Sequence, residues 1–541
     1  MVFLAGGNFQ VLKKLVFHKT KALPRFSGGR FGDAFLVIAS AILLITVGCA
    51  TNPVTQKSEL ALIPESLELE IGQSQYTHSR QMQGGDYLLD PELAQYVNEV
   101  GNRIAAVSDR KLPYEFVVLN NGTPNAWALP GGKIAVNRGL LTELRSEAEL
   151  AAVLAHEIVH AAARHGAKGV ERNLLLQGLM LAVAVASGGY DFSALAVGSA
   201  VVGANLVKQT YSREDELEAD HYSMIYLARA GYDPVAAVDL QELFVELSKE
   251  KKSNWLEGLF SSHPPSQERV EKNRETLAGL TLNEVETGVD RYSAKTAHLL
   301  ALKPAYALYE KGTRALEQSK PSEAVSLATE AIRQEPREAV FHCLLGEALS
   351  LQGDRQGALR AYNAAVQKDP GFFRHYLKRG QLHEAIKDTN LARKDLERSL
   401  ELFSTAEANL SLGRMASLGG EDRKAIDYLK EAARSGTEAG KEATQLLHRL
   451  DLPENPDRYL ISNLKFKDGR IHVFISNPTA VAISNLSLVL SKGWREKDKV
   501  RIQTAQKIAA NAYTTIPTQI RVAGKQEMRE WWLRIEKVKI Q

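Results

Sequence analysis

The chain has 541 residues, and its 67 Lys and Arg residues nearly balance its 64 Asp and Glu residues, for a formal net charge of +3. Six basic residues and one acidic residue lie in the first 48 positions, so the rest of the chain has 61 basic and 63 acidic residues, a net charge of −2. A nearly neutral chain gives no electrostatic basis for binding nucleic acid, and no nucleic-acid partner is expected.

Residues 1–48 have the layout of a signal peptide. A basic region precedes an apolar run of about 13 residues, from Phe35 to Val47, and small residues follow it. The segment ending at Cys49 resembles a bacterial lipobox, although Thr46 stands where leucine is usual. Cys49 is therefore predicted to carry a lipid and to become the first mature residue. The alternative is a plain N-terminal anchor helix.

The residues around Cys49 also predict where the protein works. No aspartate follows this cysteine, so the resemblance to lipoprotein sorting implies the periplasmic side of the cell envelope, as an outer-membrane lipoprotein. Lipidation of Cys49 would leave Cys343 as the one free cysteine, and no internal disulfide could form. Because the basic region is long for a signal peptide, the true start of translation can lie after Met1.

A turn followed by a strand is predicted at residues 130–136, where Pro-Gly-Gly precedes Lys-Ile-Ala-Val. An exposed edge strand beside a cleft can bind the backbone of an extended polypeptide as an added strand. The residues predicted to bind substrate in this way are Asn125, Ala126, Trp127 and Ala128. The alternative is an ordinary hairpin that packs under the following helix.

The most informative segment is HEIVH, residues 156–160. An alanine-rich stretch precedes it and no Gly or Pro follows until Gly166, so a helix is predicted. Residues four apart lie on one face of a helix, and His156 and His160 can therefore bind the same metal ion. Glu157 can take a proton from a water at that metal. The alternative, a solvated helical face that happens to carry two histidines, stands until a third ligand is found.

Two apolar runs separated by Gly and Ser occupy residues 174–206. Each run has about 13 residues, and a membrane span needs about 20. A buried helical hairpin is therefore predicted, and a hairpin that touches the membrane surface is the alternative.

The third ligand is predicted within residues 212–220, where Glu216 and Asp220 are again four apart on an expected helix. Zinc in hydrolytic sites takes three protein ligands and keeps one position for water, so Glu216 can complete a site for one Zn²⁺ per chain. Asp220 can accept a hydrogen bond from a ligand imidazole. Taken alone, such an acidic segment is most often a solvated helix face.

Four motifs in this order resemble the M48 zinc metallopeptidases, over about residues 50–290. They are the segment 125–139, HEIVH, EDELEAD and SHPPSQER, the last at residues 262–269. The resemblance implies a zincin-like α+β peptidase with Glu157 as the general base. The zinc ligands that it implies are His156, His160 and Glu216.

The resemblance also implies roles for three further residues. Asp220 matches a supporting aspartate, and Arg269 matches an arginine suited to stabilising the oxyanion, a contact whose loss costs on the order of 3 kcal/mol. His263 precedes two prolines, which hold its backbone extended, and it matches an inhibitory switch that takes the fourth zinc position. For Arg269 the alternative is an arginine on a helix surface. For His263 the alternative is a loop histidine that orients substrate or packs the turn.

Past residue 300 the sequence repeats with a period of 34. Small residues recur at fixed offsets: Gly312, Ala324 and Ala331, then Gly346, Ala358 and Ala365, then Gly380 and Ala392, and finally Gly413, Ala425 and Ala432. This pattern resembles tetratricopeptide repeats. Four units and a capping helix near residues 438–450 are predicted to stack into an α-solenoid with a concave binding face.

The last segment, from about Asp457, alternates apolar and polar residues, and its dipeptide Asp468-Gly469 is typical of a hairpin turn. A small antiparallel β-sandwich is predicted.

The whole chain is thus expected to be multidomain and mainly α. The predicted parts are a signal peptide at 1–48, the peptidase at 49–300, the repeats at 301–452 and the β-sandwich at 453–541. The predicted function is zinc-dependent endoproteolysis of misfolded or stalled envelope proteins, with the repeats recruiting substrate or an outer-membrane assembly machine. Two alternatives stay open. One is a chaperone-like adaptor with a latent peptidase, and the other is a processing enzyme with one substrate.

Overall fold

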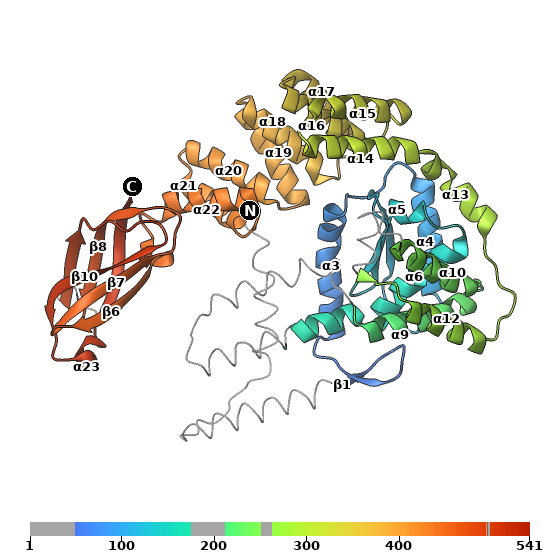
Figure 1. Ribbon diagram of the computed structural model, residues 1–541, viewed down its shortest axis with the longest axis horizontal. Coiled ribbons are helices and arrows are strands. Elements are labelled where there is room, and N and C mark those ends of the chain that lie inside the picture. The colour runs from blue at the N-terminus through green and yellow to red at the C-terminus, as the bar shows by residue number, and fades with distance from the viewer. Residues whose placement is uncertain (1–48, 174, 176–210, 250–261, 494, 496–497) are drawn as a thin grey trace. The chain divides into compact units, whose positions relative to one another are not determined.

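The computed structural model describes residues 49–541, except for residues 174, 176–210, 250–261, 494 and 496–497. The chain divides into two compact units, residues 1–338 and 339–541. Figure 1 labels the helices and strands of the described residues. The predicted signal peptide and nearly all of the predicted apolar hairpin lie outside the described residues. Within the described ranges, no helix is both long and apolar enough to cross a membrane. The predicted domain boundaries after residues 48, 300 and 452 stay predictions.

The first unit contains a three-stranded sheet made of β3 (Glu115–Leu119), β4 (Ala126–Leu129) and β5 (Lys133–Asn137). Its order is β3-β5-β4, with β3 parallel and β4 antiparallel to β5. The chain turns from β4 into β5 at Gly131 and Gly132, whose φ angles of 82° and 83° favour glycine. The turn and strand predicted at residues 130–136 are confirmed, and β4 lies at an edge of this sheet.

Helices make up most of the first unit: α3 (Glu65–Met82), α4 (Pro91–Ala105), α5 (Arg138–Leu141), α6 (Glu147–Ala162), α9 (Arg213–Arg229), α10 (Val235–Lys249), α12 (Gln267–Gly279) and α13 (Val289–Ala301). A short hairpin of β1 (Cys49–Thr51) and β2 (Ser58–Leu60) precedes them. Helix α6 packs against β4 and β5 and against α4, α9 and α10. Every residue of α6 except His156 is buried. A helix that is apolar on nearly all sides belongs inside a protein, so the alternative of a solvated face carrying two histidines is wrong.

The repeats form pairs of packed helices, as predicted. The first pair, in the first unit, is α14 (Lys303–Glu317) and α15 (Pro321–Gln334). The second unit holds α16 (Ala339–Gln352) with α17 (Arg355–Lys368), α18 (Phe373–Ala385) with α19 (Thr389–Leu402), and α20 (Ala406–Leu418) with α21 (Asp422–Ala433), followed by α22 (Glu438–Asp451). All the repeated alanines are fully buried. Gly346, Gly380 and Gly413 lie where paired helices meet: a Cβ on Gly346 would come within 2.6 Å of the Tyr362 ring.

After a short 3-10 helix, η1 (Pro456–Arg458), the second unit continues into six strands and a short helix, α23 (Lys525–Met528). The strands are β6 (Ile461–Lys467), β7 (Arg470–Asn477), β8 (Ile483–Ser491), β9 (Lys499–Thr504), β10 (Ala512–Arg521) and β11 (Trp532–Ile540). They form two antiparallel sheets, in the orders β10-β7-β6 and β11-β8-β9. Buried residues of both sheets, such as Val473 and Leu488, share one hydrophobic core. Asp468 and Gly469 join β6 to β7 with positive φ angles, which confirms the predicted hairpin.

Candidate metal centre and active site

Helix α6 carries the two histidines of the HEIVH motif. Its start is capped by the Ser146 side chain, which accepts a hydrogen bond from the backbone N–H of Glu149 at 3.1 Å. One turn separates His156 from His160, and their Nε2 atoms lie 3.0 Å apart. The predicted helix is confirmed, and both imidazoles point to the same place.

Helix α9 brings acidic residues to this place. Its first turn is held by a capping box between Ser212 and Asp215. Glu216 and Asp220 follow on one buried face, so the alternative of a solvated acidic face is wrong. The Oε2 atom of Glu216 lies 3.5 Å from His156 Nε2, and Oε1 lies 3.5 Å from His160 Nε2.

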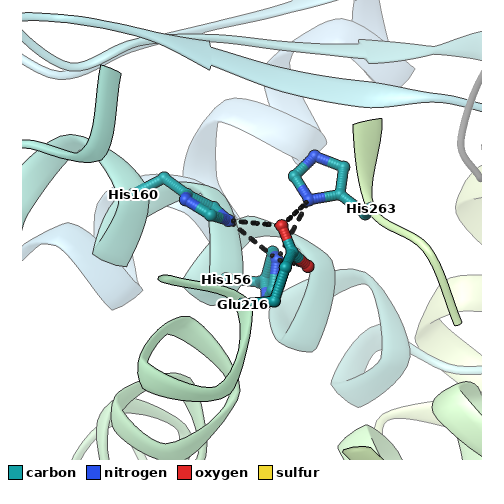
Figure 2. Close-up of side chains that lie close together, drawn as sticks. All are labelled: His156, His160, Glu216 and His263. Atoms are coloured by element: carbon teal, nitrogen blue, oxygen red, sulfur yellow. Dashed lines mark hydrogen bonds and ion pairs between the residues drawn. The ribbon is translucent and has the colours of Figure 1, made fainter. Parts of the chain in front are cut away.

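His263 approaches the same centre from the segment before α12. Its Nδ1 atom lies 2.9 Å from Glu216 Oε1 and 3.3 Å from His156 Nε2, and the residue is 6% exposed. Figure 2 shows the four side chains, His156, His160, Glu216 and His263, pointing toward one another. One nitrogen or oxygen atom from each lies within 4.8 Å of the others.

The donor atoms have the chemistry of a metal site, and several of their separations are close to those between zinc ligands. Ligands bound to zinc at about 2.0–2.1 Å in a tetrahedron are about 3.3 Å apart. The five separations given above, which involve both oxygens of Glu216, run from 2.9 to 3.5 Å, and one donor atom from each of the four residues lies within 4.8 Å of the others. Three imidazole nitrogens and a carboxylate oxygen are donors that zinc accepts. The residues present therefore fit a divalent metal ion, with His263 as the fourth donor.

Glu157 lies beside this centre and is 2% exposed. Its Oε1 atom is 3.4 Å from His263 Nε2, while Oε2 has no hydrogen-bond partner among the described residues. Burial raises the pKa of the Glu157 carboxyl above its ordinary value, against the opposing effect of His263 and His156. A cavity of about 60 Å³ adjoins Glu157, and much of its wall is apolar. Its apolar lining residues include Ala152, Val153, Ala237, Leu240 and Phe244.

Asp220 links the centre to Arg269. Its Oδ1 atom lies 3.1 Å from His156 Nδ1, and its two oxygens accept hydrogen bonds at 2.7 Å from Nε and Nη2 of Arg269. Nη1 of Arg269 lies 2.8 Å from Glu216 Oε2. Burial opposes ionisation of Asp220, but the Arg269 guanidinium outweighs it and lowers the pKa of that carboxyl. Arg269 is 7% exposed, so it is not a surface arginine.

The remaining predicted site residues lie as follows. The residues Ala126, Trp127 and Ala128 form most of the edge strand β4, and Asn125 directly precedes it. All four are buried, so β4 is not the predicted exposed strand; it forms a hairpin with β5, and α6 packs against both strands, as in the alternative. Ala126 lines the cavity beside Glu157. Cys49 begins strand β1. The chemical roles predicted for all these residues stay predictions.

Two residues that contact the centre were not found from the sequence. The Tyr211 ring stacks on the His160 ring, with centroids 3.8 Å apart. His165 contacts the other side of the same imidazole, with its Nδ1 atom 2.8 Å from His160 Nδ1. The spacing of His165, five residues after His160, carries no helical signal, because positions four apart share a helix face and positions five apart do not.

Comparison with known proteins agrees with this geometry. Residues 91–277 match the model of peptidase family M48, a span that contains all the donor residues. The chain contains an M48 peptidase domain. Residues 309–371 match a tetratricopeptide repeat model, so this M48 domain is followed by repeats. A metallopeptidase family implies a divalent metal ion, and the four donors of the M48 domain are able to hold one.

Several curated proteins are similar to parts of this chain. The beta-barrel assembly-enhancing protease of Escherichia coli O157:H7 is 27% identical over 383 residues, which cover 63% of this chain and 78% of that protein. The mitochondrial metalloendopeptidase OMA1 of Schizosaccharomyces pombe is 36% identical over 183 residues, covering 34% of this chain and 52% of that protein. For OMA1 of Arabidopsis thaliana and a relative from Vibrio cholerae, the match spans 36% and 39% of the relative's length.

Proposed function

We propose that this protein is a zinc-dependent endopeptidase of the cell envelope. The observation that carries the proposal is the convergence of His156, His160 and Glu216 on one buried point, with the Glu157 carboxylate beside it. Two imidazoles and a carboxylate are the protein ligands of many hydrolytic zinc sites.

Each residue has a proposed role. When bound, Zn²⁺ supplies Lewis acidity and makes water available as a nucleophile near neutral pH. Glu157 takes a proton from the attacking water and passes it to the leaving amine. Asp220 holds the His156 imidazole by its Nδ1 atom. Arg269 is proposed to stabilise the oxyanion, and this role requires its guanidinium, paired here with Asp220 and Glu216, to turn an N–H group toward the substrate.

His263 is proposed to be an inhibitory ligand. It supplies a fourth donor at 2.9–3.3 Å from its neighbours, whereas a hydrolytic site keeps its fourth position for water. Hydrolysis then requires His263 to leave. This arrangement favours a latent enzyme that is switched on when substrate or a partner displaces the imidazole.

The proposed substrates are unfolded or misassembled polypeptides. Strand β4 lies at the edge of its sheet and next to the Glu157 cavity, and we propose that extended substrate backbone pairs with this edge once the residues that bury it move away. The name of the Escherichia coli relative supports outer-membrane β-barrel proteins as clients. We further propose that the repeats recruit substrate or assembly machinery, and that a lipid on Cys49 anchors the protein to the outer membrane on its periplasmic side.

The exchange Glu157→Gln tests the enzymatic proposal. The variant should bind one zinc per chain and lose cleavage of unfolded casein, because the amide cannot accept the proton. Glu216→Ala should lose both metal and cleavage. Glu214→Gln, an exposed change on the same helix, is the matched control and should retain both. Cleavage by Glu157→Gln at the parent rate, or a parent without stoichiometric zinc, would refute the proposal.

The alternative is an adaptor for outer-membrane protein assembly with a latent peptidase, which the position of His263 also favours. Assembly of β-barrels in cells carrying only Glu157→Gln separates the two. Normal assembly supports the adaptor, and accumulation of stalled barrel proteins supports the peptidase. Trapped clients recovered with this variant would identify the substrates, and a single client would indicate a processing enzyme.

A further inference from the structure

His165 occupies a place that a straight helix could not give it. Successive helical residues are about 100° apart, so a residue five positions after His160 would point about 140° away from it. Helix α6 instead ends at Ala162, and Arg164 adopts a left-handed conformation with φ of 64°. A second helical segment starts at His165. This break returns the His165 ring to the His160 ring, with centroids 4.9 Å apart.

A buried ion network holds the break in place. Nε of Arg164 donates to Glu68 Oε2 at 2.9 Å, and Glu68 also accepts two hydrogen bonds from Arg110, at 2.9 and 3.0 Å. The Glu68 side chain is fully buried. A non-glycine residue with positive φ carries strain that the surrounding contacts must hold, and these contacts do so here.

The hydrogen-bond partners of His165 determine which atom carries its proton. Its Nε2 atom lies 3.1 Å from Glu218 Oε1, and a carboxylate only accepts. His165 therefore donates through Nε2, and in a neutral imidazole its Nδ1 atom then has a lone pair. His160 Nδ1, 2.8 Å away, must then donate its hydrogen to that lone pair. This leaves the lone pair of His160 on Nε2, the atom that faces the metal centre.

His156, the other histidine of the motif, is oriented by direct contact with a carboxylate. His156 Nδ1 lies 3.1 Å from the Asp220 carboxylate, so its lone pair also lies on Nε2, which faces the centre. Helix α9 thus supplies a carboxylate for each imidazole. Asp220 acts directly, and Glu218 acts through His165.

We propose that His165 is a positioning residue for the metal centre, and that with Glu218 it sets the tautomer and the ring orientation of His160. The buried position of the His165 side chain, with no exposed surface, excludes a role in contacting bulk solvent or a partner. Groups that hold a metal-bound imidazole by its second nitrogen are worth about 10- to 100-fold in metal affinity or activity. The inference rests on the proposed metal site.

The test measures metal affinity apart from catalysis, in the full chain. The zinc dissociation constant of each variant is determined by competition with a chromophoric chelator, and the visible absorption spectrum of the Co²⁺-loaded protein reports ligand geometry. His165→Leu should weaken zinc binding about 10- to 100-fold and alter the Co²⁺ spectrum. His165→Gln should recover most of the affinity, because its amide oxygen can accept from His160 Nδ1.

Glu218→Ala should weaken binding in the same direction. Combined with His165→Leu it should add nothing further, because both changes remove one linkage. Glu214→Ala, an exposed carboxylate on the same helix, is the matched control and should match the parent.

Parental zinc affinity and an unchanged Co²⁺ spectrum in folded His165→Leu would overturn this inference and leave the proposed function intact. Absence of zinc binding by the parent protein would instead refute the proposed function. If His165→Leu does not fold, Glu218→Ala decides, since Glu218 is partly exposed at 21%. Equal affinity in Glu218→Ala and the parent would then overturn the inference.

Discussion

Replacing Asp220 tests how much the buried ion pair between Asp220 and Arg269 contributes to stability beside the metal centre. Asp220→Leu removes both carboxylate oxygens that accept from Arg269 at 2.7 Å, and it leaves the charge of Arg269, a buried residue, without these partners. Breaking a buried pair by removing one partner costs about 3–5 kcal/mol. Because Glu216 remains 2.8 Å from Arg269 Nη1, the lower end applies, and we expect a loss of about 3 kcal/mol of local stability.

The assay is denaturant-dependent amide exchange of α6 and α9 in the full chain, with chelator present so that lost metal binding does not contribute. Removing both partners, with Asp220→Leu and Arg269→Met together, should cost clearly less than the sum of the two single changes. The reasoning is refuted if Asp220→Leu alone costs less than about 1 kcal/mol, or if the single changes simply add.

Two further predictions concern the second unit. Gly346→Ala should destabilise it by about 1–3 kcal/mol, since the new Cβ meets the buried Tyr362 ring. Gly436→Ala, with open space around the Cβ, is the control, and equal midpoints in urea for both would contradict the packing argument. Burial, aided by the charge of Arg374, lowers the pKa of His375 from 6.5 to about 3. The unfolded chain therefore binds a proton between these values that the folded chain does not, and stability falls by about 1.4 kcal/mol per pH unit below pH 6.5. His375→Leu should remove that part of the pH dependence, and an unchanged profile between pH 7 and 5 would show the idea to be wrong.

Local sequence patterns were sufficient to predict many of the helices, turns and repeats. The i, i+4 spacing of His156 and His160 predicts two imidazoles on one helix face, and the helix forms as expected. Gly131-Gly132 and Asp468-Gly469 predict turns because few other residues adopt positive φ, and both turns are present. The period of 34 predicts paired helices with small residues at their crossings, and the crossings lie there. Each of these features depends on residues close together in the chain.

The sequence by itself therefore determined the helix that presents two histidines, the repeated helical pairs and the hairpins, because backbone preference and side-chain periodicity are local. The segment 212–220 and the M48 resemblance named Glu216 and His263, but only the tertiary structure shows how they close the centre. The packing of α6 against α9 brings Glu216 to the histidines, and the segment before α12 adds His263 at 2.9 Å. The left-handed Arg164 returns His165 to His160 against helical periodicity, because the buried Glu68 holds the turn. Distances between residues that are far apart in the sequence depend on which apolar surfaces pack together and exclude water. The spacing of residues along the chain does not specify these distances.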